Sequence, residues 1–309
     1  MPNMRQVAAI LVSDLHLQAV PPIARSAEPD WFAAMQRPLA EISTLSDEHE
    51  CPILYAGDIF DRWNASPEVI NFALRYLPHG HAIPGQHDLP NHNYEEIDRS
   101  AYGVLVRAGL LINIKPGEKL IAGGNVAVTG WPWGFKPKPN EERWGKPGAL
   151  EVALIHEFTW IKGCGYPGAD EAAKVNTKNL AGYDVAVYGD NHKGFLVKPE
   201  KPGQPWVINC GGMMRRKTDE RDYQPGIGLL LNSGVVERYY LNTEADKFIA
   251  LTEAEEAVAQ TLNMGAFVEE LKTLGAGDAL NFKATLKRFF ETNDVREDVR
   301  KVITGVIEL

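Results

Sequence analysis

The feature that most constrains the fold is a recurring arrangement in which a short apolar run ends just before an aspartate or a histidine. Val7–Val12 is followed by "SDLHL", Pro52–Ala56 by "GDIFDR", and Ala82–Pro84 by "GQHD". Two later runs end in the same way, at "LIHEF" and at "YGDNH". Continuous apolar runs of this length are typical of strands that are covered on both faces. Ligands of open α/β sheets bind beyond the carboxyl ends of strands, so we expect the five segments to converge on one edge.

Helical segments alternate with these runs. Ser66 and Pro67 form a helix start, with serine as the N-cap and proline at the first helical position. A second helix is expected over 94–108, ending at Gly109. Further strands are predicted at Asn125–Thr129, Val152–Ile155, Asp184–Tyr188, Trp206–Asn209 and Ile227–Leu231. The alternation predicts a layered α/β sandwich around a mixed sheet.

The pattern changes near the C-terminus. Leu229–Leu241 is typical of a hairpin with its turn at Asn232, Ser233 and Gly234. A capping box begins at Thr252, and the periodicity from there to residue 309 is helical. We therefore predict one domain over 1–241 and a helical cap or interaction region over 242–309. This last region has 8 Lys and Arg against 13 Asp and Glu, so it carries -5 of the net charge of -9.

Composition narrows the class of protein. A net charge of -9 argues against extended, non-specific binding of nucleic acid through a basic surface. The three cysteines (Cys51, Cys164 and Cys210) match neither a disulfide framework nor a zinc module, which favours a reducing cytoplasm. No apolar run is long enough for a membrane span, and Val7–Val12 is too short for a signal segment. We expect a cytoplasmic protein without a membrane partner.

The polar ends of the strands predict a metal site. In a strand, residues i and i+2 point to the same side, so Asp14 and His16 would present a carboxylate and an imidazole to one ion. Each segment alone has an ordinary structural explanation, because a histidine after a strand or an aspartate in a turn is common. Five such segments in one chain favour the joint interpretation as a metal centre.

The order D-x-H, G-D-x-x-D, G-x-H-D, H and G-x-x-H resembles the signature of the calcineurin-like metallophosphoesterases, over about residues 7–241. Within that superfamily, "DLHL", "GDIFDR", the glycines Gly211 and Gly212, and the later Pro225-Gly226 most resemble the SbcD-type DNA repair nucleases. The resemblance implies an α/β/β/α sandwich with a small helical C-terminal extension. It also implies a bacterial protein, or a phage-encoded one in a bacterial host.

The resemblance also implies a role for each site residue. The first ion would be held by Asp14, His16 and His192, and Asp58 would bridge both ions. The second ion would face Gln86, His156 and Asp190. His87 would act as the general acid or steady the phosphate, and Asp88 would orient its ring. The implied cofactors are two divalent ions that activate a hydroxide, with Mn²⁺ favoured and Mg²⁺, Fe or Zn²⁺ as alternatives.

Two positions depart from the family pattern. Gln86 stands where the family has asparagine, and its side chain is longer by one methylene. Asp190 stands where the family has histidine, and it adds one negative charge. Both departures fall on the second ion. We therefore expect an ordinary first site and a second site with altered affinity or metal preference, or one that is lost.

Three further features bear on the substrate. The loop Gly130–Gly148 interleaves aromatic residues with Lys and Arg, so it either stacks bases or covers the sheet. A basic segment, Met213–Arg221, follows a predicted strand end. Arg62 either forms a surface salt bridge with Asp61 or reaches a phosphate bidentately.

Three functions are consistent with these motifs. The leading hypothesis is a metal-dependent hydrolase of ester bonds, a DNA exonuclease or endonuclease of the SbcD type. The second is a phosphatase or phosphodiesterase that acts on nucleotides or other small phosphoesters. The third is a non-catalytic binding module with a degenerate second metal site. The leading hypothesis implies DNA as substrate, with an SMC-like ATPase or a second copy of the chain as further partners.

Overall fold

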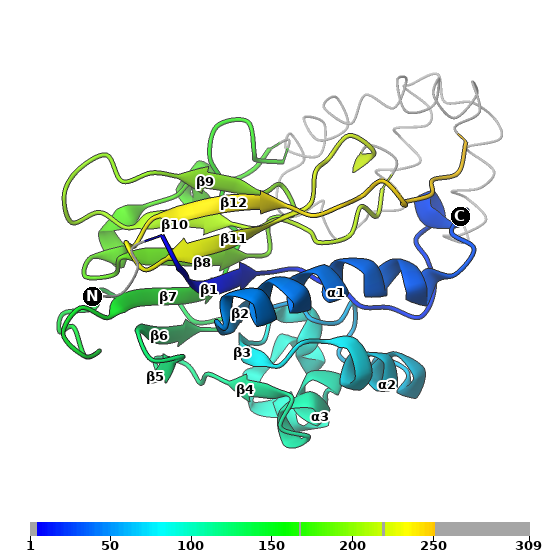
Figure 1. The fold of residues 1–309 in the computed structure, drawn as a ribbon, viewed down its shortest axis with the longest axis horizontal. Coiled ribbons are helices and arrows are strands. Elements are labelled where there is room, and N and C mark those ends of the chain that lie inside the picture. The colour runs from blue at the N-terminus through cyan, green and yellow to red at the C-terminus, as the bar shows by residue number, and fades with distance from the viewer. Residues whose placement is uncertain (1–4, 167, 218–219, 251–309) are drawn as a thin grey trace, which may run out of the picture. The chain divides into compact units, whose positions relative to one another are not determined.

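A computed structural model describes residues 5–166, 168–217 and 220–250 of the chain. The first sheet contains β1 (Val7–Val12), β2 (Ile53–Ala56), β3 (Gly80–Ile83), β4 (Leu111–Asn113), β11 (Gly226–Leu231) and β12 (Val236–Tyr240). The second contains β5 (Lys119–Ala122), β6 (Val126–Trp131), β7 (Leu150–His156), β8 (Val185–Gly189), β9 (Phe195–Val197) and β10 (Trp206–Asn209). The α-helices are α1 (Trp31–His49), α2 (Pro67–Tyr76) and α3 (Ala101–Arg107), shown with the strands in Figure 1.

Each sheet has a parallel centre with antiparallel strands added. In the first sheet the order is β12-β11-β1-β2-β3-β4, and β1 to β4 are parallel. In the second the order is β5-β6-β7-β8-β10-β9, and β6, β7, β8 and β10 are parallel. The parallel strands of each sheet therefore end at one common edge.

Three hydrophobic clusters define the layers. One lies between the helices and the outer face of the first sheet, and includes Met35, Tyr55 and Phe72. A second lies between the two sheets, where Leu54 and Val187 are fully buried. The third covers the outer face of the second sheet beneath 3₁₀ turns, which include η6 (Thr177–Leu180). This is the predicted α/β/β/α sandwich, and short 3₁₀ turns form the outer layer over the second sheet.

Most of the predicted elements are present, although β4, β5 and β9 were not predicted and the helices differ in two respects. The helix expected over 94–108 is divided at Ser100, whose side chain accepts a hydrogen bond from Gly103 N–H and caps α3. The stretch before it, η4 (Tyr94–Arg99), is a 3₁₀ helix. Helix α1 was not predicted, although Asp30 caps it by accepting from Ala33 N–H.

The hairpin prediction is confirmed by β11 and β12, which pair antiparallel across a turn in which Gly234 has a φ of 82°. The predicted helices beyond residue 251 lie outside the described residues. Among the residues that the structure describes, no helix has the length and apolar character needed to cross a bilayer.

Candidate metal centre

The carboxyl ends of both sheets bring the five motifs together. Asp14 follows β1, Asp58 follows β2, and Gln86 follows β3 in the first sheet. His156 is the last residue of β7, and Asp190 follows β8 in the second sheet. The loops after β1 and β2 stay joined beyond the strands, because Asp14 N–H donates to Gly57 and His16 N–H donates to Asp58. The prediction of one common edge is confirmed.

Four of these residues have a left-handed backbone. The φ angles are 53° at Asp14, 48° at His16, 53° at Asp58 and 78° at Asp190. Non-glycine residues rarely adopt this conformation, and where they do so together they cluster at functional sites. The observation marks this edge of the sheets as a functional site without reference to any family.

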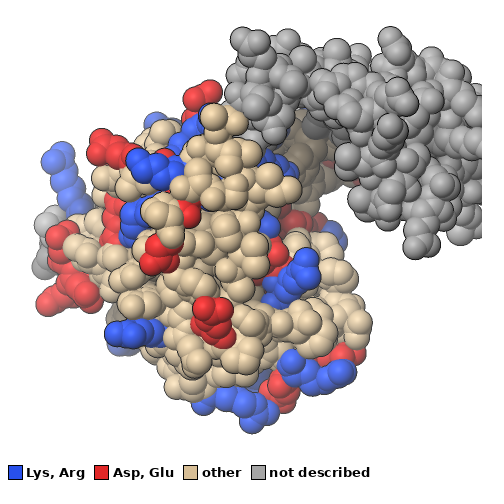
Figure 2. All heavy atoms as spheres, turned by 90° about the vertical axis from the view of Figure 1, so that its right-hand side faces the viewer, with Lys and Arg blue, Asp and Glu red and all other residues tan. Residues whose placement is uncertain are grey.

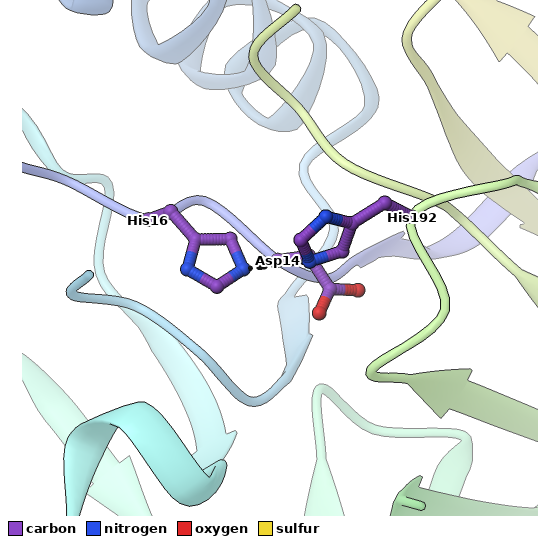
Figure 3. A group of neighbouring side chains, drawn as sticks. All are labelled: Asp14, His16 and His192. Carbon is purple, nitrogen blue, oxygen red and sulfur yellow. Dashed lines mark hydrogen bonds between the residues drawn. The ribbon is translucent and has the colours of Figure 1, made fainter. Parts of the chain in front are cut away.

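The predicted ligands of the first ion lie in direct contact. His16 Nε2 is 2.9 Å from His192 Nε2, and the ligand atoms of both lie within 4.8 Å of the Asp14 carboxylate (Figure 3). One carboxylate oxygen, Asp14 Oδ1, accepts from Asp190 N–H at 2.9 Å, which orients the group. A carboxylate and two imidazoles that converge in this way match the donors that Mn²⁺, Fe and Zn²⁺ accept.

Asp58 lies between the two halves of the site. We call the predicted ligands of the first ion (Asp14, His16 and His192) the first half, and those of the second ion (Gln86, His156 and Asp190) the second half. Its Oδ2 atom is 3.7 Å from His16 Nε2 and 3.5 Å from His156 Nε2. Its Oδ1 atom accepts from His87 N–H at 3.0 Å. The carboxylate is fully buried, so it faces the histidines of both halves without competition from solvent.

Two buried oxygens test whether the site fits a cation. Asp14 Oδ2 and Asp58 Oδ2 are buried and have no hydrogen-bond partner among the described residues. An unsatisfied buried carboxylate oxygen is costly unless a cation compensates it. In addition, His156 Nδ1 lies 2.6 Å from the Ala56 carbonyl and donates to it, which aims Nε2 into the site. These atoms fit the divalent ions that the sequence predicts.

The two departures of the second half contact each other. Gln86 Nε2 donates to Asp190 Oδ1 at 2.6 Å, and Gln86 Oε1 lies 2.7 Å from His156 Nε2. The longer glutamine side chain therefore bridges the other two predicted ligands of the second ion. The structure brings all three together, and in this arrangement they satisfy one another.

The electrostatics of the two halves differ. Burial lowers the pKa of His16 well below its usual value, and burial with the charge of Arg216 lowers the pKa of His192 to about 4. Burial raises the pKa of Asp14 to about 7. His156 behaves oppositely: burial lowers its pKa, but the Asp58, Asp14 and Asp190 carboxylates together outweigh burial and raise it to about 10.

His87 lies near the predicted ligands, but its orientation differs from the prediction. Its ring centroid is 5.0 Å from that of His16. Its Nδ1 donates to the Asp61 carbonyl at 2.8 Å, so Nε2 is left for a substrate oxygen. The prediction that Asp88 orients this ring is wrong.

The Asp88 carboxylate instead accepts three backbone N–H groups, from Ile59, Phe60 and Gly85, at 3.0 to 3.1 Å. It thereby joins the loop after β2 to the loop after β3. Burial and the nearby Asp58 raise its pKa to about 7. A carboxylate is suited to this position because it can accept several N–H groups at once.

The salt bridge considered between Asp61 and Arg62 does not form. Asp61 pairs with Arg216, which belongs to the basic segment after β10, and lies 3.8 Å from His16 Nδ1. Arg62 is exposed and lines a neighbouring cavity of about 270 Å³ together with Leu17 and Asn64. Arg216 was not singled out from the sequence, where only its place in a basic segment indicated a functional position.

The loop over 130–148 divides into two kinds of residue. Trp131 is buried and its indole donates to Tyr183, and Arg143 forms an ion pair with Asp184. Those residues cover the sheet. Trp133 instead is half-buried, and its ring centroid is 6.4 Å from that of His156. The prediction of a covering loop thus holds for Trp131 and Arg143, and the stacking of bases on this loop stays a prediction.

Comparison with known families assigns the chain to one of them. The profile of the calcineurin-like phosphoesterase family matches residues 9–194, and the chain belongs to that family. The match extends from β1 to just beyond the "YGDNH" segment, so it contains all the predicted ligands. No curated protein matches the chain.

Several solved structures are similar to the chain. TT1561 of Thermus thermophilus is 15% identical with a TM-score of 0.44, over 76% of this chain and 100% of that one. The calcineurin-like phosphoesterase YfkN from Bacillus subtilis is 14% identical with a TM-score of 0.43, over 86% and 100%. A dimetal phosphatase from Danio rerio is 9% identical with a TM-score of 0.45, over 77% and 99%.

Proposed function

We propose that the chain is a metal-dependent phosphodiesterase, that its substrate is DNA, and that Mn²⁺ is its preferred ion. The observation that carries the proposal is the position of Asp58. A buried carboxylate oxygen without a hydrogen-bond partner among the described residues faces one histidine of each half, at 3.7 and 3.5 Å. When bound, two ions in these halves would polarise the phosphoryl group and lower the pKa of water.

The residues of the chain supply the remaining functions. The first half would be held by Asp14, His16 and His192, and the second by His156 with Gln86 and Asp190. His87 is fixed by hydrogen bonds at its backbone N–H and at Nδ1, so Nε2 is its free ring nitrogen. With both ring nitrogens protonated, His87 would donate the Nε2 proton to the leaving oxygen and keep the Nδ1–H bond to Asp61. The three backbone hydrogen bonds to Asp88 keep the His87 loop in place.

Aromatic side chains beside the centre support a substrate that carries bases. Trp133 lies on the side of His156. Tyr166 is 41% exposed and stacks on Phe158, and Lys193 Nζ is 5.7 Å from the Tyr166 ring. Aromatic faces next to cations bind single-stranded nucleic acid by stacking and by contact with phosphates.

The surface charge supports local rather than extended contact with DNA. In Figure 2, Lys and Arg side chains are interspersed with Asp and Glu over the described part of the face drawn. We therefore propose that affinity for nucleic acid comes from the metal centre and its aromatic margin. An SMC-like ATPase partner and a homodimer remain proposals, as does the role of residues 242–309 as a cap or interaction region.

A second candidate function has its own supporting observation. Because Gln86 hydrogen-bonds both His156 and Asp190, the second half is satisfied without an ion. The chain would then be a one-metal protein that binds DNA or a partner without cleaving it.

The test is hydrolysis by the Mn²⁺-loaded full chain of linear duplex, single-stranded and circular DNA, beside a panel of nucleotides. We expect cleavage of DNA, and the linear and circular substrates would distinguish an exonuclease from an endonuclease. Cleavage of nucleotides alone would replace DNA by a small phosphoester. Absence of any hydrolysis, with one Mn²⁺ per chain, would favour the second candidate.

A further inference from the structure

Arg216 lies on a loop that is attached to the predicted ligands of the first ion. Gly212 N–H donates to the His192 carbonyl and Met213 N–H donates to the Asp14 carbonyl, both at 3.1 Å. Gly211 allows the turn, with a φ of 80° and no space for a Cβ atom, which would lie 2.1 Å from Tyr223 Oη. The backbone that leads to Arg216 is therefore attached directly to two residues that carry predicted ligands of the first ion.

The neighbouring arginines, Arg215 and Arg216, point to different surroundings. The Arg215 side chain is 9% exposed and hydrogen-bonds Asp246 and the carbonyls of Thr243 and Arg221. Its guanidinium also lies 5.0 Å from the Phe248 ring. These contacts use Arg215 to attach the segment around residue 246 to the domain. Arg215 is therefore a structural residue.

Arg216 instead lies beside the metal centre. Its side chain is 24% exposed, and among the described residues its guanidinium hydrogen-bonds Asp61. Asp61 in turn is 3.8 Å from His16 Nδ1, so one carboxylate separates the guanidinium from the first half of the metal centre. The loop is held by Glu220, which accepts from Arg216 N–H and Lys217 N–H.

We propose that Arg216 binds a non-bridging oxygen of the substrate's phosphate on the His16 side of the centre, and that Asp61 holds it in place before the substrate arrives. A guanidinium has five N–H donors in a planar fork, so it can keep one bond to Asp61 and donate others to a phosphate. The inference rests on the proposed hydrolysis of a phosphoester, but not on DNA being the substrate.

The negative charge of the site explains why a cation such as Arg216 would help to bind the substrate. The four carboxylates around the centre (Asp14, Asp58, Asp61 and Asp190) repel an anionic substrate, and a fixed cation offsets part of that repulsion. Charge-assisted bonds from arginine to phosphate are short and directional, so they also fix the orientation of the scissile bond. Arg216 is thus a substrate-positioning residue in addition to the predicted ligands and His87.

The test compares Arg216→Met and Arg216→Lys with Lys217→Met, which removes one positive charge from the adjacent, exposed position. The full-length proteins are loaded with Mn²⁺, their metal content is measured, and inorganic phosphate is titrated by calorimetry. Loss of a hydrogen bond between charged groups should weaken phosphate binding about tenfold or more in Arg216→Met. Arg216→Lys should lie between this value and the wild type, and Lys217→Met should stay within about twofold.

Hydrolysis of bis(4-nitrophenyl) phosphate gives a second measurement, in which kcat/KM of Arg216→Met should fall while its Mn²⁺ content stays unchanged. Phosphate affinity equal to that of the wild type in Arg216→Met would overturn the inference. If that variant loses metal or stability, Arg216→Lys decides in the same way. If the wild type hydrolyses nothing, the proposed function fails, yet the phosphate titration still tests Arg216. Absence of phosphate binding to the wild type would overturn the inference.

Discussion

The two halves of the metal centre use similar side chains but hold them differently. In the first half, His16 and His192 face each other with lowered pKa values, and Asp14 Oδ2 has no hydrogen-bond partner among the described residues. In the second half, His156 has a raised pKa and is joined by Gln86 to Asp190. In the first half an ion would replace the contact between His16 Nε2 and His192 Nε2, both of which belong to histidines with lowered pKa values. The second half must break hydrogen bonds and lose a proton.

The largest loss of metal and of hydrolysis rate is expected from substitution of Asp58, which faces both halves. Asp58→Ala removes the carboxylate that faces both, so we expect loss of Mn²⁺ from both halves. The rate should fall on the order of 10³-fold, the upper end for loss of one electrostatic stabiliser. Metal analysis and single-turnover hydrolysis measure the two effects.

The matched control is Asp98→Ala, because the Asp98 side chain is 70% exposed and pairs only with a surface arginine among the described residues. It should retain both metal and rate. If Asp58→Ala keeps two ions per chain, Asp58 does not link the halves.

His87 is not a predicted ligand, although one of its ring nitrogens lies within 4.8 Å of ligand atoms of His16 and Asp58, and its substitution tests whether it serves chemistry or metal binding. His87→Gln should lower kcat by about 10²-fold or more, the range for loss of a general acid, with Mn²⁺ content unchanged. The control His79→Gln changes an exposed histidine outside the five motifs. A kcat that stays at the wild-type value would assign proton transfer to another group.

The proton difference between the halves predicts a pH dependence. At pH 8, Asp14, with a pKa of about 7, is mainly ionised, and His16 and His192 are neutral. His156, with a pKa of about 10, still carries a proton that an ion must displace. Overall Mn²⁺ affinity should therefore rise with pH, by up to about tenfold per pH unit.

Calorimetry in two buffers of different ionisation enthalpy measures this proton release. Heats that do not depend on the buffer at pH 8 would show that His156 is already neutral. In the metal-free protein, the contribution of His156 to folding stability changes with pH in the opposite direction to Mn²⁺ affinity. Its raised pKa means that His156 adds stability that is fully present below about pH 6.5 and lost as pH rises through about 10.

The smallest effect is expected from restoring the family pattern in the second half. In Gln86→Asn with Asp190→His, the shorter amide no longer reaches both neighbours, so His156 Nε2 is released toward an ion. We expect second-ion affinity to rise about tenfold, within the range for changes around metal ligands. Titration of Mn²⁺ stoichiometry measures it, and an unchanged stoichiometry and rate would mean that the two departures are harmless.

Elements with a clear local sequence pattern could be predicted, and elements without one could not. The strands β1, β2, β7 and β8 were predicted because their residues are apolar without interruption, and buried parallel strands require this. Helix α1 was not predicted, although Asp30 caps it; it contains Pro38, a residue that is unfavourable in a helix interior. The helix over 94–108 was predicted too long, since Ser100 acts there as a cap.

What the sequence by itself determined is the set of chemical groups and their order along the chain. Asp14 and Asp58 stand at the ends of neighbouring strands, and parallel strands of one sheet end together, so their shared edge followed from pattern alone. His156 ends a strand of the second sheet, and the packing of the two sheets brought it to the same edge. Tertiary structure decided which groups each side chain contacts. Asp88 bonds backbone rather than His87, and Asp61 pairs with Arg216, which lies 155 positions away. Such contacts depend on how separate loops meet in space, and a local sequence pattern does not predict which distant residues will meet.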